Sequence, residues 1–361
     1  MAKRAYNFSA GPGVLPESVL REVQEEMLDY RGHGLSVMEM SHRSPVYQGI
    51  IDDAINRVKR LMKIGDDYEV LFLQGGASTQ FLMIPMNFCQ EGKVANYINT
   101  GAWSTKAIAE AKKIGKEVHV AATSEDKNFT YIPKEFKLSE NPAYLHITTN
   151  NTIRGTEYKH IPELPAGVPI IADMSSNIFS KPLDFKRFDV IYAGAQKNMG
   201  PAGVTLVVIK KEMLKTINKN IPTMLDYSIH ASKGSMFNTP PTFAIYVVGK
   251  VLNWIEEMGG LEAIEKRNIK KADYMFNIFD SSDFFRGTVV PEDRSLMNIP
   301  FRLPSEELEK KFLKEATESG FLNIKGHRSV GGCRVSLYNS LPMRAAEDLA
   351  KFMIEFEKNN K

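Results

Sequence analysis

The sequence predicts an α/β fold with a mainly parallel central sheet, followed by a smaller α+β domain. From about residue 17 onward, short apolar segments alternate with helix-like stretches, the order typical of parallel strands joined by crossover helices. At 361 residues the chain also exceeds the size of about 250 to 300 residues beyond which one hydrophobic core rarely grows. We therefore expect a large domain of residues 17–260 and a small domain of residues 261–361. An N-terminal segment, residues 1–16, is expected to pack near the functional site.

Short apolar segments are the expected strands of the large domain. They cover residues 69–74, 93–99, 117–122, 143–149, 168–174, 189–195 and 204–210. Several of them run directly into Gly, Ser, Thr or Asn, residues that start turns and cap helices. Because open α/β sheets bind ligands at the carboxyl ends of their strands, we expect the functional residues at these points.

The rest of the chain predicts one long loop and the elements of the α+β domain. Residues 215–242 contain Pro222, Pro240 and Pro241 and show no clear period, which is typical of a long loop. The other expected elements are helices at 242–259, 261–280 and 345–359 and strand pieces at 295–303 and 333–339.

The composition predicts a soluble protein and argues against several classes of function. With 46 basic and 43 acidic side chains, the net charge of +3 does not suggest a nucleic-acid partner. The two cysteines, Cys89 and Cys333, cannot form a disulfide framework, so we expect a reducing, cytoplasmic location. No apolar run approaches the roughly 18 residues of a membrane span, and the seven histidines show no metal-ligand spacing. We expect no membrane partner and no metal.

Lys197 is the first candidate functional residue. It follows the apolar segment 189–195, where burial lowers the pKa of an ammonium and frees the amine to act as a nucleophile. Such an amine can form a Schiff base with an aldehyde cofactor, and pyridoxal phosphate is the natural candidate. Asp173, near the end of the segment 168–174, could hold the proton on the cofactor's ring nitrogen. The alternative for Asp173 is a turn or helix cap, because Asp-Met-Ser-Ser is good capping sequence.

Two further stretches suit the same cofactor. Residues 75–79, Gly-Gly-Ala-Ser-Thr, lie between an expected strand and an expected helix, where backbone amides and the helix dipole can bind a phosphate. This stretch lacks the G-x-G-x-x-G pattern of dinucleotide-binding proteins. Trp103, just past another strand end, could stack on a pyridine ring or could equally be a core residue.

Nine motifs in order along the chain resemble those of the phosphoserine aminotransferases, which are class V enzymes of the fold-type I pyridoxal phosphate family. The motifs are NFSAGPG (7–13), MEMSHRS (38–44), GGASTQF (75–81), NTGAWS (99–104), NNTIRGT (150–156), ADMSS (172–176), YAGAQKNMGPAG (192–203), NTPPTF (238–243) and GHRSVGGCRVSLYN (326–339). Because they span nearly the whole chain, the resemblance implies the fold-type I architecture throughout.

The resemblance also implies roles for single residues. Lys197 would be the catalytic Schiff-base lysine, Asp173 the partner of the ring nitrogen and Trp103 the stacking residue. Further cofactor contacts are implied for Gly76, Ala77, Ser78, Thr152, Gln196, Asn238 and Thr239, the last two from the other subunit of a homodimer. Substrate contacts are implied for Ser9, His42, Arg43, His327, Arg328 and Arg334, with His42 and Arg43 reaching across the dimer. The α-carboxylate of the substrate would bind Arg334, whose planar guanidinium can donate two hydrogen bonds.

The implied activity is the transfer of the amino group of L-glutamate to 3-phosphooxypyruvate, giving O-phospho-L-serine and 2-oxoglutarate. This reaction belongs to serine biosynthesis, and a phosphorylated hydroxythreonine, in pyridoxine biosynthesis, is a possible second substrate. The chain departs from many relatives at Ser78, where they carry an arginine. Recognition of the substrate's phosphate should therefore depend more on His42, Arg43, His327 and Arg328.

Four alternative functions remain open at this point. An alanine- or serine-glyoxylate aminotransferase is disfavoured by the basic pair His42-Arg43, which suits a phosphorylated substrate. A cysteine desulfurase needs a catalytic cysteine on a mobile loop, and neither cysteine looks like one. A dehydrogenase is disfavoured by the missing glycine fingerprint. A cofactor-free binding protein is the fourth, and a yellow protein whose absorption is abolished by borohydride would exclude both of the last two.

Overall fold

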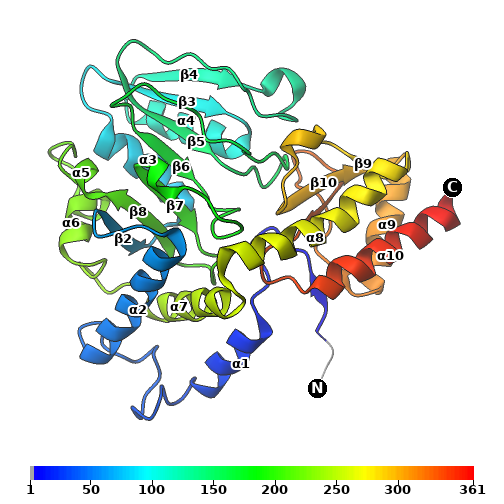
Figure 1. Cartoon of the computed structure of the whole chain (residues 1–361), viewed down its shortest axis with the longest axis horizontal. Coiled ribbons are helices and arrows are strands. Elements are labelled where there is room, and N and C mark those ends of the chain that lie inside the picture. Colours follow the sequence, from blue (N-terminus) through cyan, green and yellow to red (C-terminus); the bar gives the residue numbers. More distant parts are fainter. Residues whose placement is uncertain (1–3) are drawn as a thin grey trace.

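The computed structural model describes residues 4–361, which form a larger and a smaller lobe (Figure 1). A seven-stranded sheet forms the centre of the larger lobe. Its strands, in sheet order, are β2 (Tyr68–Leu73), β8 (Thr205–Lys210), β7 (Val190–Gly194), β6 (Ile170–Asp173), β5 (Pro142–Thr148), β3 (Val94–Asn99) and β4 (Val118–Thr123). Each strand lies within two residues of the segment predicted for it, because long buried apolar runs leave little freedom in their placement.

The sheet is mainly parallel, as predicted. Strands β7, β6, β5, β3 and β4 are parallel to one another, and β8 is antiparallel to both of its neighbours, β7 and β2. In the register of the three central strands, Thr148 lies beside Asp173 and Asp173 beside Tyr192. The carboxyl ends of β5, β6 and β7 therefore meet at one edge of the sheet, and the site lies there.

Helices cover both faces of this sheet. They are α1 (Glu17–Glu25), α2 (Pro45–Met62), α3 (Gly76–Phe88), α4 (Ala102–Lys113), α5 (Lys211–Leu214), α6 (Tyr227–Ser232) and α7 (Thr242–Glu257). Side chains of α2 and α7 join the core on one face, and side chains of α3 and α4 join a separate core on the other. Three-residue 3-10 turns lie at Glu125–Lys127, Phe185–Arg187, Thr223–Leu225 and Pro291–Asp293.

The long loop predicted for residues 215–242 is wrong in its middle, where α6 forms. The side chain of Asp226 caps this helix by accepting a hydrogen bond from the backbone of Ser228 at 2.7 Å. Tyr227 is fully buried in the core and donates a hydrogen bond to Gln80. The prolines flank the helix rather than interrupt it, so tertiary packing decides its formation.

The smaller lobe has its own core, built on a three-stranded antiparallel sheet. Its elements are α8 (Gly260–Ser281), β9 (Arg286–Gly287), β10 (Asn298–Arg302), α9 (Glu306–Glu318), β11 (Phe321–Leu322), β12 (Cys333–Ser336) and α10 (Met343–Asn360). Helix α8 spans both lobes, since Leu261 and Ile264 pack in the larger core whereas Ala272 and Met275 pack in the smaller. The boundary proposed at residue 260 stays a prediction.

The N-terminal segment belongs structurally to the smaller lobe. Strand β1 (Tyr6–Asn7) pairs in parallel with β11, and Phe8 is buried in the smaller core. The segment then crosses to the larger lobe, where the backbone of Gly13 donates to Gln196 at 2.6 Å. Residues 8–13 thus connect the two lobes beside the edge of the central sheet.

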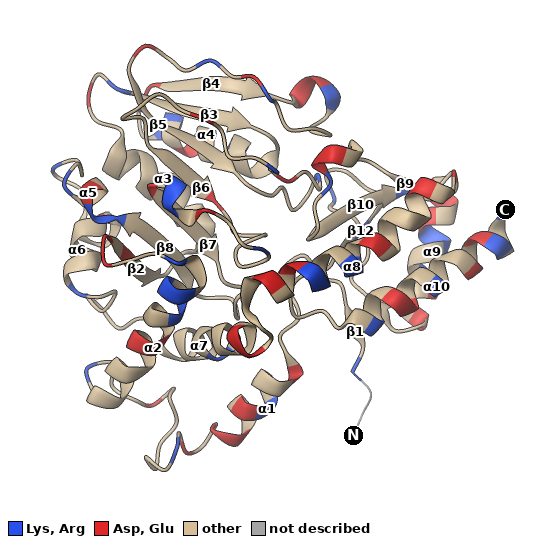
Figure 2. Cartoon of the chain, in the orientation of Figure 1, with Lys and Arg blue, Asp and Glu red and all other residues tan. Residues whose placement is uncertain are grey.

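Charged residues lie mainly on the outer elements. Figure 2 shows acidic and basic segments interspersed along α8 and α10, whereas most of the central sheet is uncharged. Among residues 4–361, no helix combines the length and the hydrophobicity needed to cross a membrane.

Candidate active site

A pocket of about 380 Å³ lies at the carboxyl ends of β5, β6 and β7, between the two lobes. The sequence-predicted residues that line it are Gly76, Ala77, Ser78, Trp103, Thr152, Asp173, Gln196, Lys197, His327 and Arg334. The larger lobe supplies the first eight of these residues, and the smaller lobe supplies His327 and Arg334. Both domains must therefore be in place for the pocket to exist.

Lys197 extends into this pocket from the turn that follows β7. Its Nζ donates a hydrogen bond of 2.7 Å to the hydroxyl of Thr152 and lies 5.6 Å from the centre of the Trp103 ring. Burial lowers the pKa of Lys197 to about 8, although the Asp173 carboxylate opposes this shift. A substantial fraction of this amine is uncharged near neutral pH, as a nucleophile or a base requires.

Asp173 ends β6 and is almost fully buried at the floor of the pocket, with 4% of its surface exposed. Burial raises the pKa of its carboxyl, while hydrogen bonds from Ser175 and the charge of Lys197 oppose the rise. One carboxylate oxygen accepts a hydrogen bond of 2.9 Å from the backbone of Ser175. The buried carboxylate is therefore incompletely neutralised and suits a cationic partner.

The stretch predicted to bind phosphate forms a tight turn that leads into α3. Gly75 and Gly76 adopt left-handed backbone conformations, with φ of 90° and 66°. A Cβ atom on Gly75 would lie 2.0 Å from the Thr79 hydroxyl, so only glycine fits there. Gly76, Ala77 and Ser78 then form the first turn of α3 and line the pocket, where an anion gains from the helix dipole.

Arg334 and His327 form the wall supplied by the smaller lobe. Arg334, on β12, donates a hydrogen bond of 3.2 Å to the Thr152 carbonyl, and burial lowers its pKa. His327 has its Nδ1 atom 2.8 Å from the Ser329 hydroxyl. Burial lowers the pKa of His327, and the charges of Arg334, Arg328 and Lys106 lower it further. This wall is electropositive and suits an anionic substrate.

Pyridoxal phosphate fits the residues of this pocket. Four polar atoms of lining residues are buried without a protein partner: Trp103 Nε1, Thr148 Oγ1, Asn150 Oδ1 and Arg334 Nε. Unsatisfied buried polar atoms are rare in proteins and indicate a missing ligand. The pocket also combines an amine for the aldehyde, a carboxylate for the ring nitrogen, an indole for the ring and a helix N-terminus for the phosphate.

Six predicted residues lie outside the lining of this pocket. Ser9 precedes the lining residues Ala10 and Gly11, and Arg328 is exposed beside His327. His42, Arg43, Asn238 and Thr239 lie on other parts of the surface, and all but His42 are exposed. Asn238 lines a second pocket on the opposite side of the phosphate turn, together with Gly75 and Thr79. The predicted roles of these six residues stay predictions.

Several lining residues were missed by the sequence analysis. They are Ala10, Gly11, Thr148, Asn150, Ile153, Ser175 and Ser176. The polar residues among them lie at or just after the ends of β5 and β6. Because polar residues at strand ends were expected to form the site, the same pattern could have identified them. Ala10 and Gly11 carried no such signal, because contacts distant in the sequence place them there: the pairing of β1 with β11 and the hydrogen bond of 2.7 Å that Tyr338 donates to the Ala10 carbonyl.

The cysteines argue against a desulfurase. Cys89 and Cys333 are both buried, and burial raises the pKa of both thiols. A desulfurase needs an accessible thiolate, which neither residue offers.

Comparison with known proteins agrees with this site. Residues 5–349 match the family Aminotransferase class-V. The chain is 57% identical to a phosphoserine aminotransferase of Desulfatibacillum aliphaticivorans over 361 residues, which cover 100% of both chains. It is 54% identical to that of Listeria monocytogenes serovar 1/2a, over 99% of this chain and 98% of the relative.

Solved structures lead to the same group. A phosphoserine aminotransferase from Bacillus circulans subsp. alkalophilus superposes with a TM-score of 0.97 at 50% identity, covering 100% of both chains. A PLP-bound phosphoserine aminotransferase from Trichomonas vaginalis gives a TM-score of 0.93 at 39% identity and covers 97% of this chain and 100% of that one. An alanine-glyoxylate aminotransferase from Nostoc sp. shares only the fold, with a TM-score of 0.76 at 16% identity. The pocket and these full-length likenesses place the chain in the class-V aminotransferase family, among the phosphoserine aminotransferases.

Proposed function

We propose that this protein transfers the amino group of L-glutamate to 3-phosphooxypyruvate, with pyridoxal phosphate as cofactor, to give O-phospho-L-serine and 2-oxoglutarate. The observation that carries the proposal is the meeting of Lys197, Asp173 and the first turn of α3 in one pocket. An amine of lowered pKa, a buried carboxylate and a helix N-terminus are the three groups this cofactor requires. The names of the full-length relatives support this substrate.

Each pocket residue has a definite task in this reaction. Pyridoxal phosphate, when bound, supplies an aldehyde carbon that carries the amino group and a ring that withdraws electrons from it. Asp173 holds the proton at the ring nitrogen, and Thr152 and Trp103 orient the ring. Lys197 Nζ accepts the proton from the substrate α-carbon and later returns it, as general base and then general acid. Its pKa of about 8 suits both roles.

Substrate binding depends on the positive wall of the pocket. Arg334 grips the α-carboxylate, and its Nε atom is buried without a protein partner and available to a ligand. His327 and Arg328 face the far end of the substrate, where glutamate carries a carboxylate and phosphooxypyruvate a phosphate. Because Ser78 adds no charge, we assign the rest of phosphate recognition to His42 and Arg43 of a second subunit.

The active form is then a homodimer with shared sites. Large apolar side chains are exposed in the segments that carry the predicted site residues outside the pocket. They are Leu28 and Met38, in the segment before His42, and Phe237, next to Asn238. An interface with a second subunit would cover these exposed apolar side chains. Asn238 and Thr239 would complete the phosphate cradle of the partner. We place the protein in the cytoplasm, and assign a phosphorylated hydroxythreonine as a second substrate because it offers the same charged end.

A direct test combines absorption spectra with substrate pairs. The purified protein should be yellow, and borohydride should abolish the absorption band by reducing the bond to Lys197. Single-turnover spectra with a panel of amino donors and keto acids should then show fast reaction with glutamate and with phosphooxypyruvate. A colourless protein that gains no band on addition of pyridoxal phosphate would refute the cofactor. Equal rates with pyruvate or glyoxylate would refute the phosphorylated substrate.

A further inference from the structure

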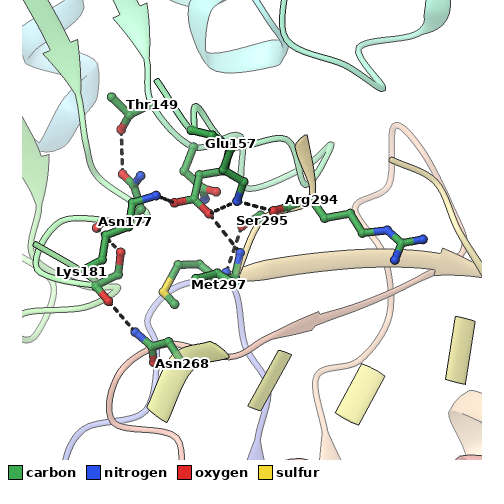
Figure 3. Close-up of polar contacts among 12 residues, drawn as sticks. Thr149, Glu157, Asn177, Lys181, Asn268, Arg294, Ser295 and Met297 are labelled. Carbon is green, nitrogen blue, oxygen red and sulfur yellow. Dashed lines mark hydrogen bonds and ion pairs between the residues drawn. The ribbon is translucent and has the colours of Figure 1, made fainter. Parts of the chain in front are cut away.

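A buried carboxylate, Glu157, lies at the junction of three chain segments, one of which carries the pocket residue Thr152 (Figure 3). It is 0% exposed, and its two carboxylate oxygens bind different partners. One oxygen lies 2.7 Å from the ammonium of Lys181, and the other lies 3.3 Å from that of Lys159. The second oxygen also accepts a hydrogen bond of 3.1 Å from the backbone of Leu296. A buried charge is costly unless its partners fully compensate it. Glu157 therefore depends on these partners, and water could not take their place.

The first segment is the hairpin of residues 149–158, which carries Thr152 near its tip. The backbone of Asn151 donates to the Thr156 carbonyl at 2.8 Å, and Gly155 donates to the Asn151 carbonyl at 2.7 Å. Glu157 therefore sits on the returning arm of the hairpin that presents Thr152 to Lys197. A shift of this arm moves the hydroxyl that binds the lysine.

The second segment is the chain of residues 174–181, which continues from Asp173. Thr149 donates through its backbone and its hydroxyl to the Asp173 carbonyl, at 3.0 and 3.1 Å. The same hydroxyl lies 2.7 Å from the side-chain oxygen of Asn177. The segment ends at Lys181, whose ammonium binds Glu157. The ion pair thus joins the loop after Asp173 to the hairpin of Thr152.

The third segment, residues 293–298, enters the smaller lobe. Glu157 donates through its backbone to the Asp293 carbonyl at 2.9 Å, and Ser295 donates to the Gly155 carbonyl at 2.8 Å. Contact here is tight, because a Cβ atom on Gly155 would lie 2.3 Å from Pro300. Pro300 in turn pairs with Arg334 in the sheet of the smaller lobe.

We propose that Glu157 is a positioning residue for the transamination site. Its carboxylate holds together the hairpin of Thr152, the loop that follows Asp173 and the segment that leads to the strand beside Arg334. Neutral side chains also link the segments, since Asn150 donates to Ser176 at 2.8 Å and to Asn298 at 2.9 Å, but Glu157 is the buried carboxylate that joins all three. The inference rests on the proposed function, because it assigns a purpose to the geometry of that same pocket.

The test compares Glu157→Gln with a matched control, Glu309→Gln, in the holoenzyme. Glu309 is also a buried carboxylate, but it pairs with Arg302 in the smaller lobe and lines no part of the pocket. Both variants should lose thermal stability. In Glu157→Gln alone, kcat should fall roughly ten- to a hundred-fold, as expected for a small misplacement of catalytic groups. The pH midpoint of the cofactor's absorption band should also move, because the hydroxyl of Thr152, which binds Lys197, is no longer held in a fixed position.

A double variant separates positioning from stability. Glu157→Gln with Lys181→Gln removes the unpaired buried ammonium, so stability should recover while kcat and the pH midpoint stay altered. If stability, kcat and the pH midpoint all recover in the double variant, the proposal is overturned. It is also overturned if Glu157→Gln has the same kcat and pH midpoint as the control Glu309→Gln. If Glu157→Gln does not fold, the single variant Lys181→Gln is measured instead, and an unchanged kcat and pH midpoint in that variant would overturn the proposal. A wild-type protein without a cofactor band would instead refute the proposed function.

Discussion

The floor and the mouth of the pocket are built in opposite ways. On the floor, Lys197, Asp173 and Thr152 come from consecutive strand ends, and each has a hydrogen-bond partner within the chain. Under the proposed function, the mouth is completed by Arg328 and by Arg43 and Thr239 of a second subunit; in this chain all three are exposed, and none of them lines the pocket. The difference leads to our proposal that one chain holds the cofactor-binding groups by itself, whereas recognition of a phosphorylated substrate is completed by a second subunit.

This comparison predicts different kinds of loss in the two regions. A substitution on the floor should lower turnover, because the groups there act on the reacting atoms. A substitution at the mouth should mainly raise the Michaelis constant of the phosphorylated substrate, because those groups bind a distant charge.

The largest effect is expected for Lys197→Ala. Turnover should fall by at least about four orders of magnitude, since one change removes both a nucleophile and a base. Lys210→Ala is the matched control, because Lys210 also stands at the end of a strand of the central sheet, as the last residue of β8, but pairs with Asp189 away from the pocket. Steady-state turnover of both variants, with circular dichroism as a check of folding, decides the matter. Measurable turnover in Lys197→Ala would contradict the assignment.

Asp173→Asn should have the next largest effect. The amide keeps the size of the side chain but cannot hold a proton at the ring nitrogen by its charge. Turnover should fall on the order of a hundred-fold, while the dissociation constant of the cofactor rises only a few-fold. Stopped-flow turnover and fluorescence titration of the cofactor measure the two quantities. Equal losses of turnover and of cofactor affinity would show that Asp173 only holds the ring in place.

Arg43→Ala tests the mouth. The Michaelis constant for phosphooxypyruvate should rise about thirty-fold or more, as expected when a desolvated phosphate loses one charged partner, and that for glutamate should rise less. Arg31→Ala, in the same exposed segment but paired with Glu26, should change neither constant. Mixing Arg43→Ala with Lys197→Ala subunits should restore activity, since one site of each hybrid keeps both residues. Subunit exchange without recovered activity would place Arg43 in its own chain's site.

The smallest effect concerns pH and the amine of Lys197. Because its pKa is lowered to about 8, the neutral fraction in the cofactor-free protein should rise only about tenfold between pH 7 and pH 9 and then level off. An ordinary lysine would gain about a hundredfold over the same range and continue to gain above it. The rate at which the apoprotein takes up pyridoxal phosphate measures this fraction. A rate that still climbs steeply above pH 9 would show that burial does not tune the amine.

The same contrast explains how much could be predicted from the sequence. The strands and the residues at their ends were found because apolar runs and the polar residues that follow them are local signals. Lys197 and Asp173 each stand directly at such an end. The turn at Gly75 was found for the same reason, because left-handed glycines after a strand are visible in one short stretch.

Features that depend on distant partners could not be predicted. In the sequence TEYK, Glu157 looks like a surface residue, and only its pairing with Lys181 and Leu296 makes its burial possible. Helix α6 forms because Tyr227 packs against α3, where it reaches Gln80. Ala10 and Gly11 lie in the segment expected near the site, but their places in the pocket depend on distant contacts: the pairing of β1 with β11 and the hydrogen bond from Tyr338 to the Ala10 carbonyl.

That pairing has a consequence for how the enzyme comes into being. Tyr6 pairs with Phe321, which is synthesised only after the whole larger lobe. Strand β1 must therefore wait for its partner, and contacts of such high sequence separation form slowly. Lys197, Asp173 and the phosphate turn can assemble as soon as the central sheet closes. The pocket, whose lining includes Ala10, Gly11 and Arg334, is consequently complete only when the smaller lobe has been synthesised.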